Sequence, residues 1–361
     1  MTSGRAPCKN RDVMRAAGTL VGCVKSPGSP DILKERIDIK KIGVVLLNLG
    51  GPEKPADVEP FLYNLFSDRK IIRLGPAYLQ KPIARLIAWR RAPKSRAAYR
   101  QIGGGSPLGR ITSAQGRALE EALQKTGVFQ AVVAMRYWQP SARQALAQLA
   151  ANGVDRIVAL PLYPHYSKAT TGSSLDDLHD AAASFSSAFA ITAIREWPEQ
   201  PRYIEALAAV IRDGLQRFPA GDVQVVYSAH SLPKKFIEEG DPYLDHIRRT
   251  ISAVEGITGA AGRLCFQSRS GPVEWLAPST PEMLEQLAAE GCRHILMVPV
   301  SFVSDHVETL YEIDILYREM AEKLGMNLRR SESLNTGPRF IAALREMVAG
   351  AAEDMGWLSN S

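Results

Sequence analysis

The sequence predicts an α/β fold made of two halves, each a parallel sheet flanked by helices, that face each other across a cleft. Short runs of β-forming residues alternate with longer amphipathic segments, and this βαβα order favours parallel sheets. The halves also resemble each other. Residues 44–52 (VVLLNLGGP) align with residues 225–233 (VVYSAHSLP), which sets Leu49 against His230. The length of 361 residues suits two such domains.

The basic character of the chain is concentrated at its N-terminus. The formal net charge is +6, and residues 1–41 hold nine Lys/Arg and four Asp/Glu, which leaves +1 for the remainder. This distribution argues against a nucleic-acid partner. Because residues 1–41 are rich in Gly, Ser and Pro and lack an apolar period, we expect a disordered basic tail. The tail has no apolar core typical of a secretory signal.

Neither the apolar residues nor the cysteines indicate a membrane or secreted protein. No run of 18 apolar residues is present. Cys8, Cys23, Cys265 and Cys292 lie far apart and form no CxxC pair, so we expect free thiols in a reducing compartment. The expected location is the cytoplasm.

In the first half, residues 42–195, four strands are expected, over 43–47, 131–135, 156–160 and 188–194. Gly50 and Gly51 follow the first strand and permit a turn close to a ligand. Helices are expected from 57–61 onward and over 113–126, 142–152 and 174–184. The glycine-rich loop 102–107 has neither the P-loop nor the dinucleotide pattern, so we interpret it as a loop that approaches a ligand or turns the chain.

In the second half, residues 196–337, the sequence locates strands over 223–227, 263–267 and 294–298. Helices are expected over 202–218, 243–254 and 280–290, the last with Ser279 or Thr280 at its start as a cap. A final helix, within about 338–361, is expected to pack back on the first half.

Residues 69–119 contain twelve Lys/Arg and no acidic residue. Leu79, Ile83, Leu86 and Ile87 recur among them at helical spacing. Two interpretations follow. The segment is either an ordinary amphipathic helix docked on the core, or a cationic surface with exposed apolar residues that suits an anionic ligand or a membrane interface.

Two polar groups follow strands of the second half. His230 ends the strand over 223–227, and Asp305, Glu308 and Glu312 would share one face of a helix that starts near Ser304, with His306 beside them. Ligands bind beyond the carboxyl ends of parallel strands, so both groups are expected at one crevice. They suit proton transfer or transient binding of a divalent cation. The alternative is that Asp305 and Glu308 form a capping box and Glu312 is solvated.

Together, several motifs resemble the ferrochelatase family from about Ile42 onward. They are residues 47–52 (LNLGGP), 90–107, 227–233 (YSAHSLP), 240–243 (GDPY) and 304–314. The resemblance implies a chelatase fold of two Rossmann-like domains, each with a parallel four-stranded sheet flanked by helices. It also implies insertion of Fe²⁺ into protoporphyrin IX with release of two protons, the last step of haem synthesis.

The resemblance also assigns roles to single residues. His230 matches the active-site histidine and Glu308 its acidic partner, both in contact with the metal. Asp305, His306 and Glu312 match the adjoining polar path for metal or protons. The expected porphyrin-binding residues are Leu49, Arg91, Ser106, Arg136, Tyr137, Trp275 and Phe302. Whether His230 or the side of Arg136 and Tyr137 delivers the iron stays open.

No resident cofactor is expected. Some family members carry a [2Fe–2S] cluster on cysteines of a C-terminal extension, but no cysteine follows Cys292 here. The apolar, cationic segment 78–96 predicts peripheral contact with the inner membrane. The alternatives are a coproporphyrin-preferring ferrochelatase, a non-catalytic porphyrin or haem carrier, and a chelatase for another tetrapyrrole.

Overall fold

A computed structural model describes residues 41–186, 188–219, 221–269 and 271–358. The predicted disordered tail lies outside these residues apart from Lys41, so it stays a prediction.

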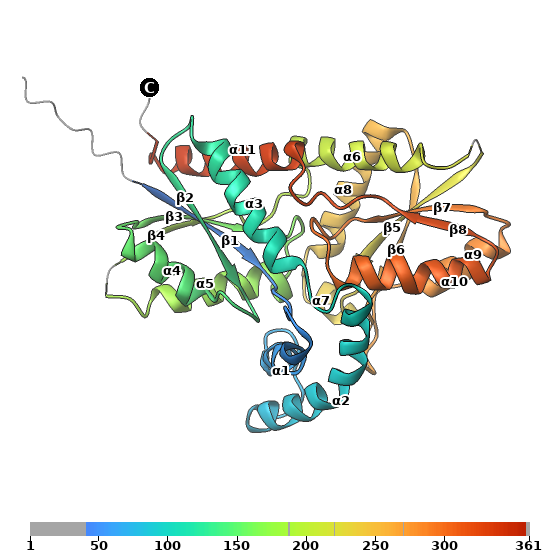
Figure 1. The fold of residues 1–361 in the computed structure, drawn as a ribbon, viewed down its shortest axis with the longest axis horizontal. Coiled ribbons are helices and arrows are strands. Elements are labelled where there is room, and N and C mark those ends of the chain that lie inside the picture. Colours follow the sequence, from blue (N-terminus) through green and yellow to red (C-terminus); the bar gives the residue numbers. More distant parts are fainter. Residues whose placement is uncertain (1–40, 187, 220, 270, 359–361) are drawn as a thin grey trace, which may run out of the picture. The chain divides into compact units, whose positions relative to one another are not determined.

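The first sheet has four parallel strands in the order β2-β1-β3-β4 (Figure 1). They are β1 (Ile42–Asn48), β2 (Phe129–Met135), β3 (Arg156–Pro161) and β4 (Ala190–Ala193). All seven residues of β1 are buried, as expected for a central strand of a parallel sheet covered on both faces. The connecting helices are α3 (Leu108–Leu123), α4 (Ala142–Ala151) and α5 (Ser173–Ala182), the last preceded by a short π-helix, η3 (Lys168–Gly172).

The second sheet repeats this order as β6-β5-β7-β8, again with all strands parallel. Its strands are β5 (Val223–His230), β6 (Gly262–Gln267), β7 (His294–Pro299) and β8 (Asn327–Arg330). Its helices are α6 (Pro201–Leu215), α7 (Lys234–Glu238), α8 (Tyr243–Thr258), α9 (Thr280–Ala289), the π-helix η4 (Glu308–Tyr317) and α10 (Arg318–Lys323). The predicted fold class, two parallel sheets flanked by helices, is confirmed.

The alternation of side chains along the central strands separates one shared core from two smaller ones. Val44 and Leu46 of β1 belong to the same apolar cluster as Val225 and Tyr227 of β5. The intervening side chains point to the other face of each sheet. There, Val45 packs in a cluster with residues of α4 and α5, and Val226 packs in a cluster with residues of α9, η4 and α10.

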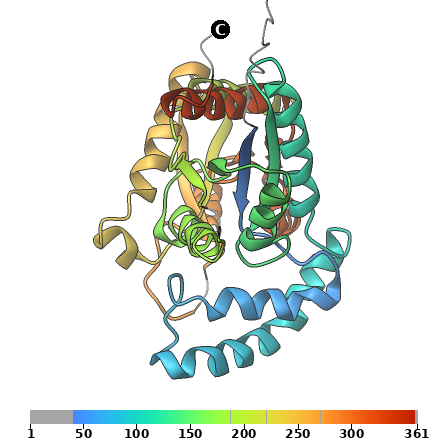
Figure 2. The same ribbon diagram turned by 90° about the vertical axis from the view of Figure 1, so that its left-hand side faces the viewer.

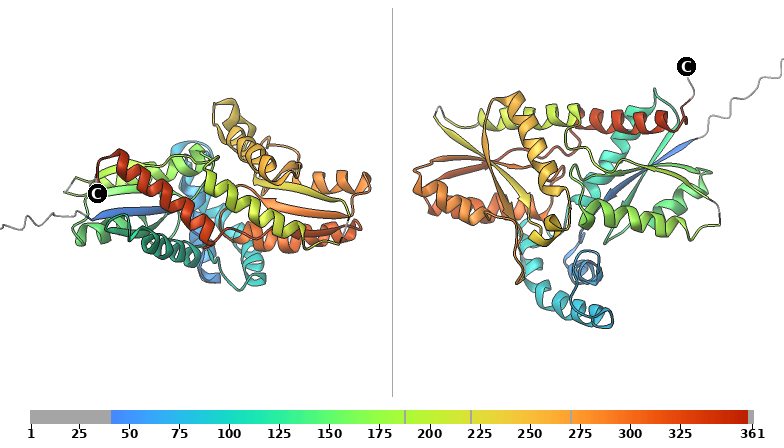
Figure 3. Two further views of the ribbon diagram at one scale, coloured as in Figure 1. Left: turned by 90° about the horizontal axis from the view of Figure 1, so that it is seen from above. Right: turned by 180° about the vertical axis from the view of Figure 1, so that it is seen from behind.

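The last helix, α11 (Pro338–Asp354), contributes to the shared core. It contacts α3, β3 and α6, and it runs end to end with α6 (Figure 3). Arg345 anchors it to the end of α3, because its Nε donates to Ala122 O at 3.1 Å and its Nη2 to Thr126 Oγ1 at 3.2 Å.

Two helices between β1 and α3 stand apart from the sheets and lie side by side (Figures 1 and 2). They are α1 (Val58–Ser67) and α2 (Gln80–Gln101), each preceded by a short 3₁₀ turn, η1 (Pro55–Asp57) and η2 (Ala77–Leu79). We call residues 55–101 the lip.

Small residues form the buried face of α2. Ala84, Ala88 and Ala92 recur every four residues and are buried. By contrast, Leu86 is 54% exposed, Trp89 is 62% exposed, and Tyr78 just before the helix is 78% exposed. α2 is therefore docked on α1 through its alanines and Tyr99, while Leu86 and Trp89 remain exposed.

Candidate active site

His230 is the last residue of β5, and its neighbours fix the imidazole at the carboxyl end of the second sheet. Its backbone N–H donates to Ser301 Oγ at 3.0 Å, and its carbonyl oxygen accepts from the Tyr243 hydroxyl at 2.9 Å. The ring Nδ1 lies 2.8 Å from Glu308 Oε2. Because a carboxylate can only accept, Nδ1 carries the hydrogen and the neutral ring keeps a lone pair on Nε2. The side chain is 39% exposed, so a substrate can reach it.

Glu308 begins the π-helix η4. The expected helix start near Ser304 is wrong by a few residues, since 302–306 are irregular. The reason lies in the side chains: the His306 N–H donates to Thr309 Oγ1 at 3.0 Å, and the Asp305 N–H donates to Asn335 Oδ1 at 3.0 Å. Because these backbone N–H groups bond to side chains, residues 302–306 stay irregular and the helix begins later in the sequence.

Ser268, directly after β6, joins the two glutamates of this helix. Its Oγ lies 2.6 Å from Glu308 Oε2 and 2.7 Å from Glu312 Oε2. A hydroxyl has one hydrogen to donate, so both contacts are satisfied when Glu312 is protonated and donates to Ser268. Ser268 has φ of 64°, in the left-handed region that costs energy for a residue with a Cβ. Strain of this kind is typical of functional sites.

The cluster separates the pKa values of its members. Burial alone would raise the pKa of Glu308, but the His230 ring beside it brings that pKa well below its usual value. Burial would lower the pKa of His230, and the Glu308 carboxylate raises it instead. Burial and the charge of Glu308 together raise the pKa of Glu312 to about 7. A base and a neutral acid thus lie next to each other, an arrangement suited to proton transfer.

His306 approaches the same cluster from the other side of Glu308. Its Nδ1 donates to Ser304 O at 3.0 Å, so Nε2 keeps its lone pair, 3.8 Å from Glu308 Oε1. Burial lowers the pKa of His306 despite the nearby carboxylate. The Phe302 ring packs on the imidazole with centroids 4.4 Å apart. The structure therefore brings together His230, His306, Glu308, Glu312 and Phe302.

Asp305 belongs to a different network. It accepts from Ser333 Oγ at 2.7 Å and Asn335 Nδ2 at 2.8 Å, and it pairs with Arg330 at 3.1 Å. The capping-box alternative is wrong as well. Glu308 bonds to His230 and Ser268, and Glu312 bonds to Ser268 and to Gln267 Nε2 at 3.2 Å.

At the carboxyl end of the first sheet, Leu49, Arg136 and Tyr137 are neighbours. The Tyr137 N–H donates to Leu49 O at 3.0 Å. The Arg136 guanidinium lies over the Tyr137 ring, 4.9 Å from its centroid. Arg136 and the Tyr137 hydroxyl both donate to Asp68, at 2.6 Å and 2.8 Å. This second polar group occupies the place in its sheet that the His230 cluster occupies in the other.

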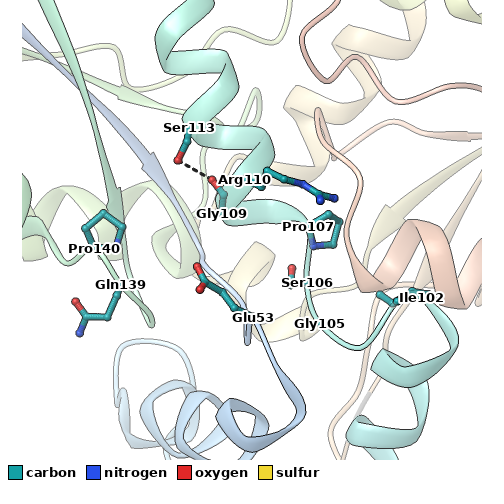
Figure 4. A pocket seen from close by; sticks show the side chains of 11 residues that line it. Glu53, Ile102, Gly105, Ser106, Pro107, Gly109, Arg110, Ser113, Gln139 and Pro140 are labelled. Atoms are coloured by element: carbon teal, nitrogen blue, oxygen red, sulfur yellow. Dashed lines mark hydrogen bonds between the residues drawn. The ribbon is translucent and has the colours of Figure 1, made fainter.

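The remaining predicted residues lie elsewhere. Arg91 is exposed on α2, with its guanidinium 5.2 Å from the centroid of the Phe66 ring. Trp275 pairs with Pro233 in an antiparallel bridge between the loops that follow β5 and β6. Ser106 lines a cavity of about 550 Å³ with Glu53, Arg110, Ser113 and Gln139 (Figure 4). His230 and Glu308 do not line this cavity, so its size gives no support to their assignment.

The ferrochelatase family model matches residues 41–352. The chain belongs to the ferrochelatase family. A ferrochelatase of Desulfotalea psychrophila is 61% identical over 306 residues, which cover 85% of this chain and 96% of that protein. A ferrochelatase of Geotalea uraniireducens is 53% identical over 312 residues, with coverage of 86% and 97%. Membership in this family implies a porphyrin and iron as substrates.

Solved structures place the fold among the chelatases. SirB from Bacillus subtilis with Fe³⁺ superposes with a TM-score of 0.53 at 10% identity, covering 89% of this chain and 100% of that one. The sirohydrochlorin chelatase SirB in complex with cobalt superposes with a TM-score of 0.50 at 12% identity, covering 87% of this chain and 96% of that one. At these identities the likeness concerns the fold alone.

Two features are absent from the part of the chain that the structure describes. No group of three or more His, Cys, Asp and Glu side chains is placed to hold a metal ion. No helix in this part of the chain is long and apolar enough to cross a membrane.

Ser268, Gln267 and Asp68 were not predicted as site residues. Gln267 Nε2 donates to Glu308 O at 3.0 Å, and its Oε1 accepts from Ser228 Oγ at 2.6 Å. The strand-end rule that identified His230 points to both Gln267 and Ser268, because Gln267 ends the neighbouring strand β6 and Ser268 follows it. Asp68 ends α1 and carries no comparable signal.

Proposed function

We propose that the protein inserts Fe²⁺ into protoporphyrin IX, which yields protohaem and two protons. The observation that carries the proposal is the contact of 2.8 Å between His230 Nδ1 and Glu308 Oε2. The porphyrin ring must lose two pyrrole protons as the metal enters, and this pair supplies a base that is exposed at the end of a strand. Membership in the family indicates the class of reaction, and the His230–Glu308 pair accounts for the removal of the pyrrole protons.

In this proposal His230 Nε2 accepts a pyrrole proton. Glu308, bonded to Nδ1, stabilises the imidazolium that forms, as carboxylates do for catalytic histidines. Ser268 connects Glu308 to Glu312, so a hydrogen-bonded path leads from the histidine along η4. His306 presents its Nε2 lone pair beside Glu308, where it would assist the passage of the metal. Binding energy along the ring would favour a distorted porphyrin with exposed nitrogen lone pairs.

Metal insertion into protoporphyrin by purified protein tests the proposal. His230→Ala should lower the rate at least about a hundredfold, the usual contribution of a general base, while His179→Ala on the exposed face of α5 should leave it unchanged. Equal rates for wild type and His230→Ala would contradict the role of His230. A Soret shift without metal insertion would instead identify a porphyrin carrier.

The lip favours protoporphyrin over coproporphyrin. Its exposed Tyr78, Leu86 and Trp89 suit a ring with two propionates and an apolar remainder better than a ring with four. Rates measured side by side on the two porphyrins, with Fe²⁺, Zn²⁺ and Co²⁺, decide this preference. Faster insertion into coproporphyrin would overturn it, and a preference for Co²⁺ with a reduced ring would indicate another tetrapyrrole.

We infer that the enzyme works without a resident cofactor. Of the described cysteines, Cys265 is buried and Cys292 partly buried, and burial raises the pKa of each thiol, that of Cys265 to about 11. Neutral thiols are poor metal ligands. Visible and EPR spectra of the purified protein should show no iron–sulfur signal, and such a signal would contradict this inference.

The lip also supports peripheral contact with an anionic membrane, from the cytoplasmic side. Leu86 and Trp89 are exposed on a helix whose charged residues are all basic, and such helices bind the interface of anionic bilayers. Sedimentation with phosphatidylglycerol vesicles at low salt should fall in the Leu86→Ala/Trp89→Ala variant. It should not fall in Ile257→Ala/Leu324→Ala, which removes exposed apolar groups outside the lip. Equal sedimentation of both variants would contradict membrane contact through the lip.

A further inference from the structure

Asp68, at the end of α1, accepts four hydrogen bonds through its carboxylate. Its Oδ2 accepts from Arg136 Nη2 at 2.6 Å, the Tyr137 hydroxyl at 2.8 Å and Ser173 Oγ at 3.1 Å. Its Oδ1 accepts from the Lys70 N–H at 2.8 Å. The side chain is 8% exposed. A buried carboxylate is stable only with such partners, and charged partners strengthen each bond.

The side-chain donors to Asp68 come from a different part of the fold. Asp68 belongs to the lip region, whereas Arg136 and Tyr137 follow β2 and Ser173 begins α5. Asn64 of α1 adds a bond, from its Nδ2 to Tyr137 O at 3.1 Å. The end of α1 is thereby joined to the carboxyl end of the first sheet through polar contacts centred on one carboxylate.

Asp68 also limits the orientations open to Arg136. Nη2 is held by Asp68, Nε donates to Ser173 Oγ at 2.8 Å, and Nη1 lies 3.5 Å from Asp177 Oδ1. Ser173 itself donates to Asp68. Without the Asp68 carboxylate, the shortest remaining hydrogen bond of the Arg136 guanidinium is the one to Ser173. The plane of the guanidinium can then turn about that bond.

We infer that Asp68 is a positioning residue for porphyrin binding, which holds Arg136 and Tyr137 in one arrangement at the crevice and joins that arrangement to the lip. The inference rests on the proposed function and on the role in porphyrin binding that the family resemblance implies for Arg136 and Tyr137. Asp68 itself need not touch the substrate.

The first test is Asp68→Asn, which keeps the shape of the side chain but removes its charge. The KM for porphyrin should rise about tenfold, the consequence of losing a hydrogen bond to a charged group, while kcat stays within about twofold because the His230 cluster is untouched. Asp176→Asn is the matched control. Asp176 pairs with Lys70 at 2.6 Å on the surface, so its loss removes a neighbouring ion pair without affecting Arg136, and KM should not change.

A double-mutant cycle with Arg136→Ala tests whether Asp68 acts through the arginine. The increase in KM for the double variant should match that of Arg136→Ala alone, because two changes on one path are not additive. Additive effects would overturn the inference. If Arg136→Ala leaves KM unchanged, the proposed pocket wall is wrong. If Arg136→Ala raises KM and Asp68→Asn does not, only the inference about Asp68 fails.

Circular dichroism and thermal unfolding show whether the variants are folded. If Asp68→Asn does not fold, Asp68→Glu replaces it. Glutamate keeps the charge but moves the oxygens by one methylene, so it should retain the fold and still raise KM. A wild-type KM in folded Asp68→Glu would overturn the inference.

Discussion

At the scale of single residues, the carboxylate of Glu308 sets the pH range in which His230 can act. His230 accepts a proton only when it is neutral. Because Glu308 raises the pKa of His230 against the effect of burial, the acid limb of the kcat/KM profile should lie above the ordinary imidazole pKa of about 6.5. In Glu308→Gln the main group that opposes burial is lost and only Glu312 still raises the pKa of His230, so that pKa should fall and the limb should move to lower pH while the plateau rate falls.

Zn²⁺ insertion measured between pH 5.5 and 9 gives both profiles. His179→Ala serves as the control and should keep the wild-type limb. An acid limb that stays in place in Glu308→Gln would show that the limb reports a group other than His230.

Ser268 combines strain with function, and two substitutions separate them. Ser268→Ala removes the hydroxyl that bridges Glu308 and Glu312 and keeps the strained backbone. Ser268→Gly removes the hydroxyl and relieves the strain, so it should be more stable than Ser268→Ala by about 1 kcal/mol. Both variants should lose activity to a similar extent, about tenfold. Urea unfolding and insertion rates measure the two effects, and full activity in either variant would show that the bridge is dispensable.

The sequence was sufficient to predict that His230 and Glu308 lie close together, because they come at or after the ends of neighbouring strands in a parallel sheet. The strand-end rule points to the position of Ser268 as well, but no spacing reveals its left-handed φ or its contacts to Glu308 and Glu312. The sequence also predicted that Asp305 lies beside Glu308 and Glu312, since a helix that begins at Ser304 would place all three side chains on one face. The bonds from Arg330, Ser333 and Asn335 come from a segment far along the chain, and they direct Asp305 elsewhere.

At the scale of elements, two helical glycines differ in what surrounds them. A Cβ at Gly214 of α6 would lie 2.7 Å from Leu296 Cδ1, and Leu296 is fully buried. A Cβ at Gly256 of α8 would meet nothing within 4 Å. Gly214→Ala should therefore destabilise the protein by about 1–3 kcal/mol through overpacking, whereas Gly256→Ala should stabilise it by up to about 1 kcal/mol through helix propensity.

Chemical denaturation of the two glycine variants beside the wild type measures these changes. Equal stability of Gly214→Ala and the wild type would mean that α6 and β7 can move apart at no cost.

Most strands could be predicted because a central parallel strand is an apolar run between turns, as in β1 and β7. A fourth strand was expected in the second sheet, but β8 could not be located along the chain because its four residues include Arg329 and Arg330, which suit an edge strand but give no apolar run. The face of α2 could not be predicted for a related reason. Three alanines make up most of its buried face, and Leu86 and Trp89 are exposed, so the large apolar residues do not mark the buried side.

At the scale of the whole molecule, His165 joins the two halves and makes stability depend on pH. Its ring lies 2.9 Å from Thr250 Oγ1 of α8 and packs against the Tyr243 ring. Burial, with a smaller effect of His246, lowers the pKa of His165 to about 3. The folded state thus stays neutral where the unfolded state takes up a proton. The stability from this residue is complete above the unfolded pKa of about 6.5 and is lost as pH falls toward 3.

Between pH 7.5 and 5.0 the wild type should therefore lose about 2 kcal/mol more stability than His165→Gln. Urea unfolding of both proteins at the two pH values measures the difference. The comparison cancels the carboxylates that titrate in both proteins. An equal loss in the two proteins would show that His165 does not cause this pH dependence.

The apolar cluster that runs from β1 through α11 to β5 has a consequence for how the protein unfolds. Neither sheet has a separate core on its inner face, since Val44 and Leu46 belong to the same apolar cluster as Val225 and Tyr227. Two sheets of the same strand order could have been two independently melting domains, but a shared interior makes them cooperative. Heat should therefore unfold them in one calorimetric transition, and either half expressed alone would expose the apolar surface that the other half covers.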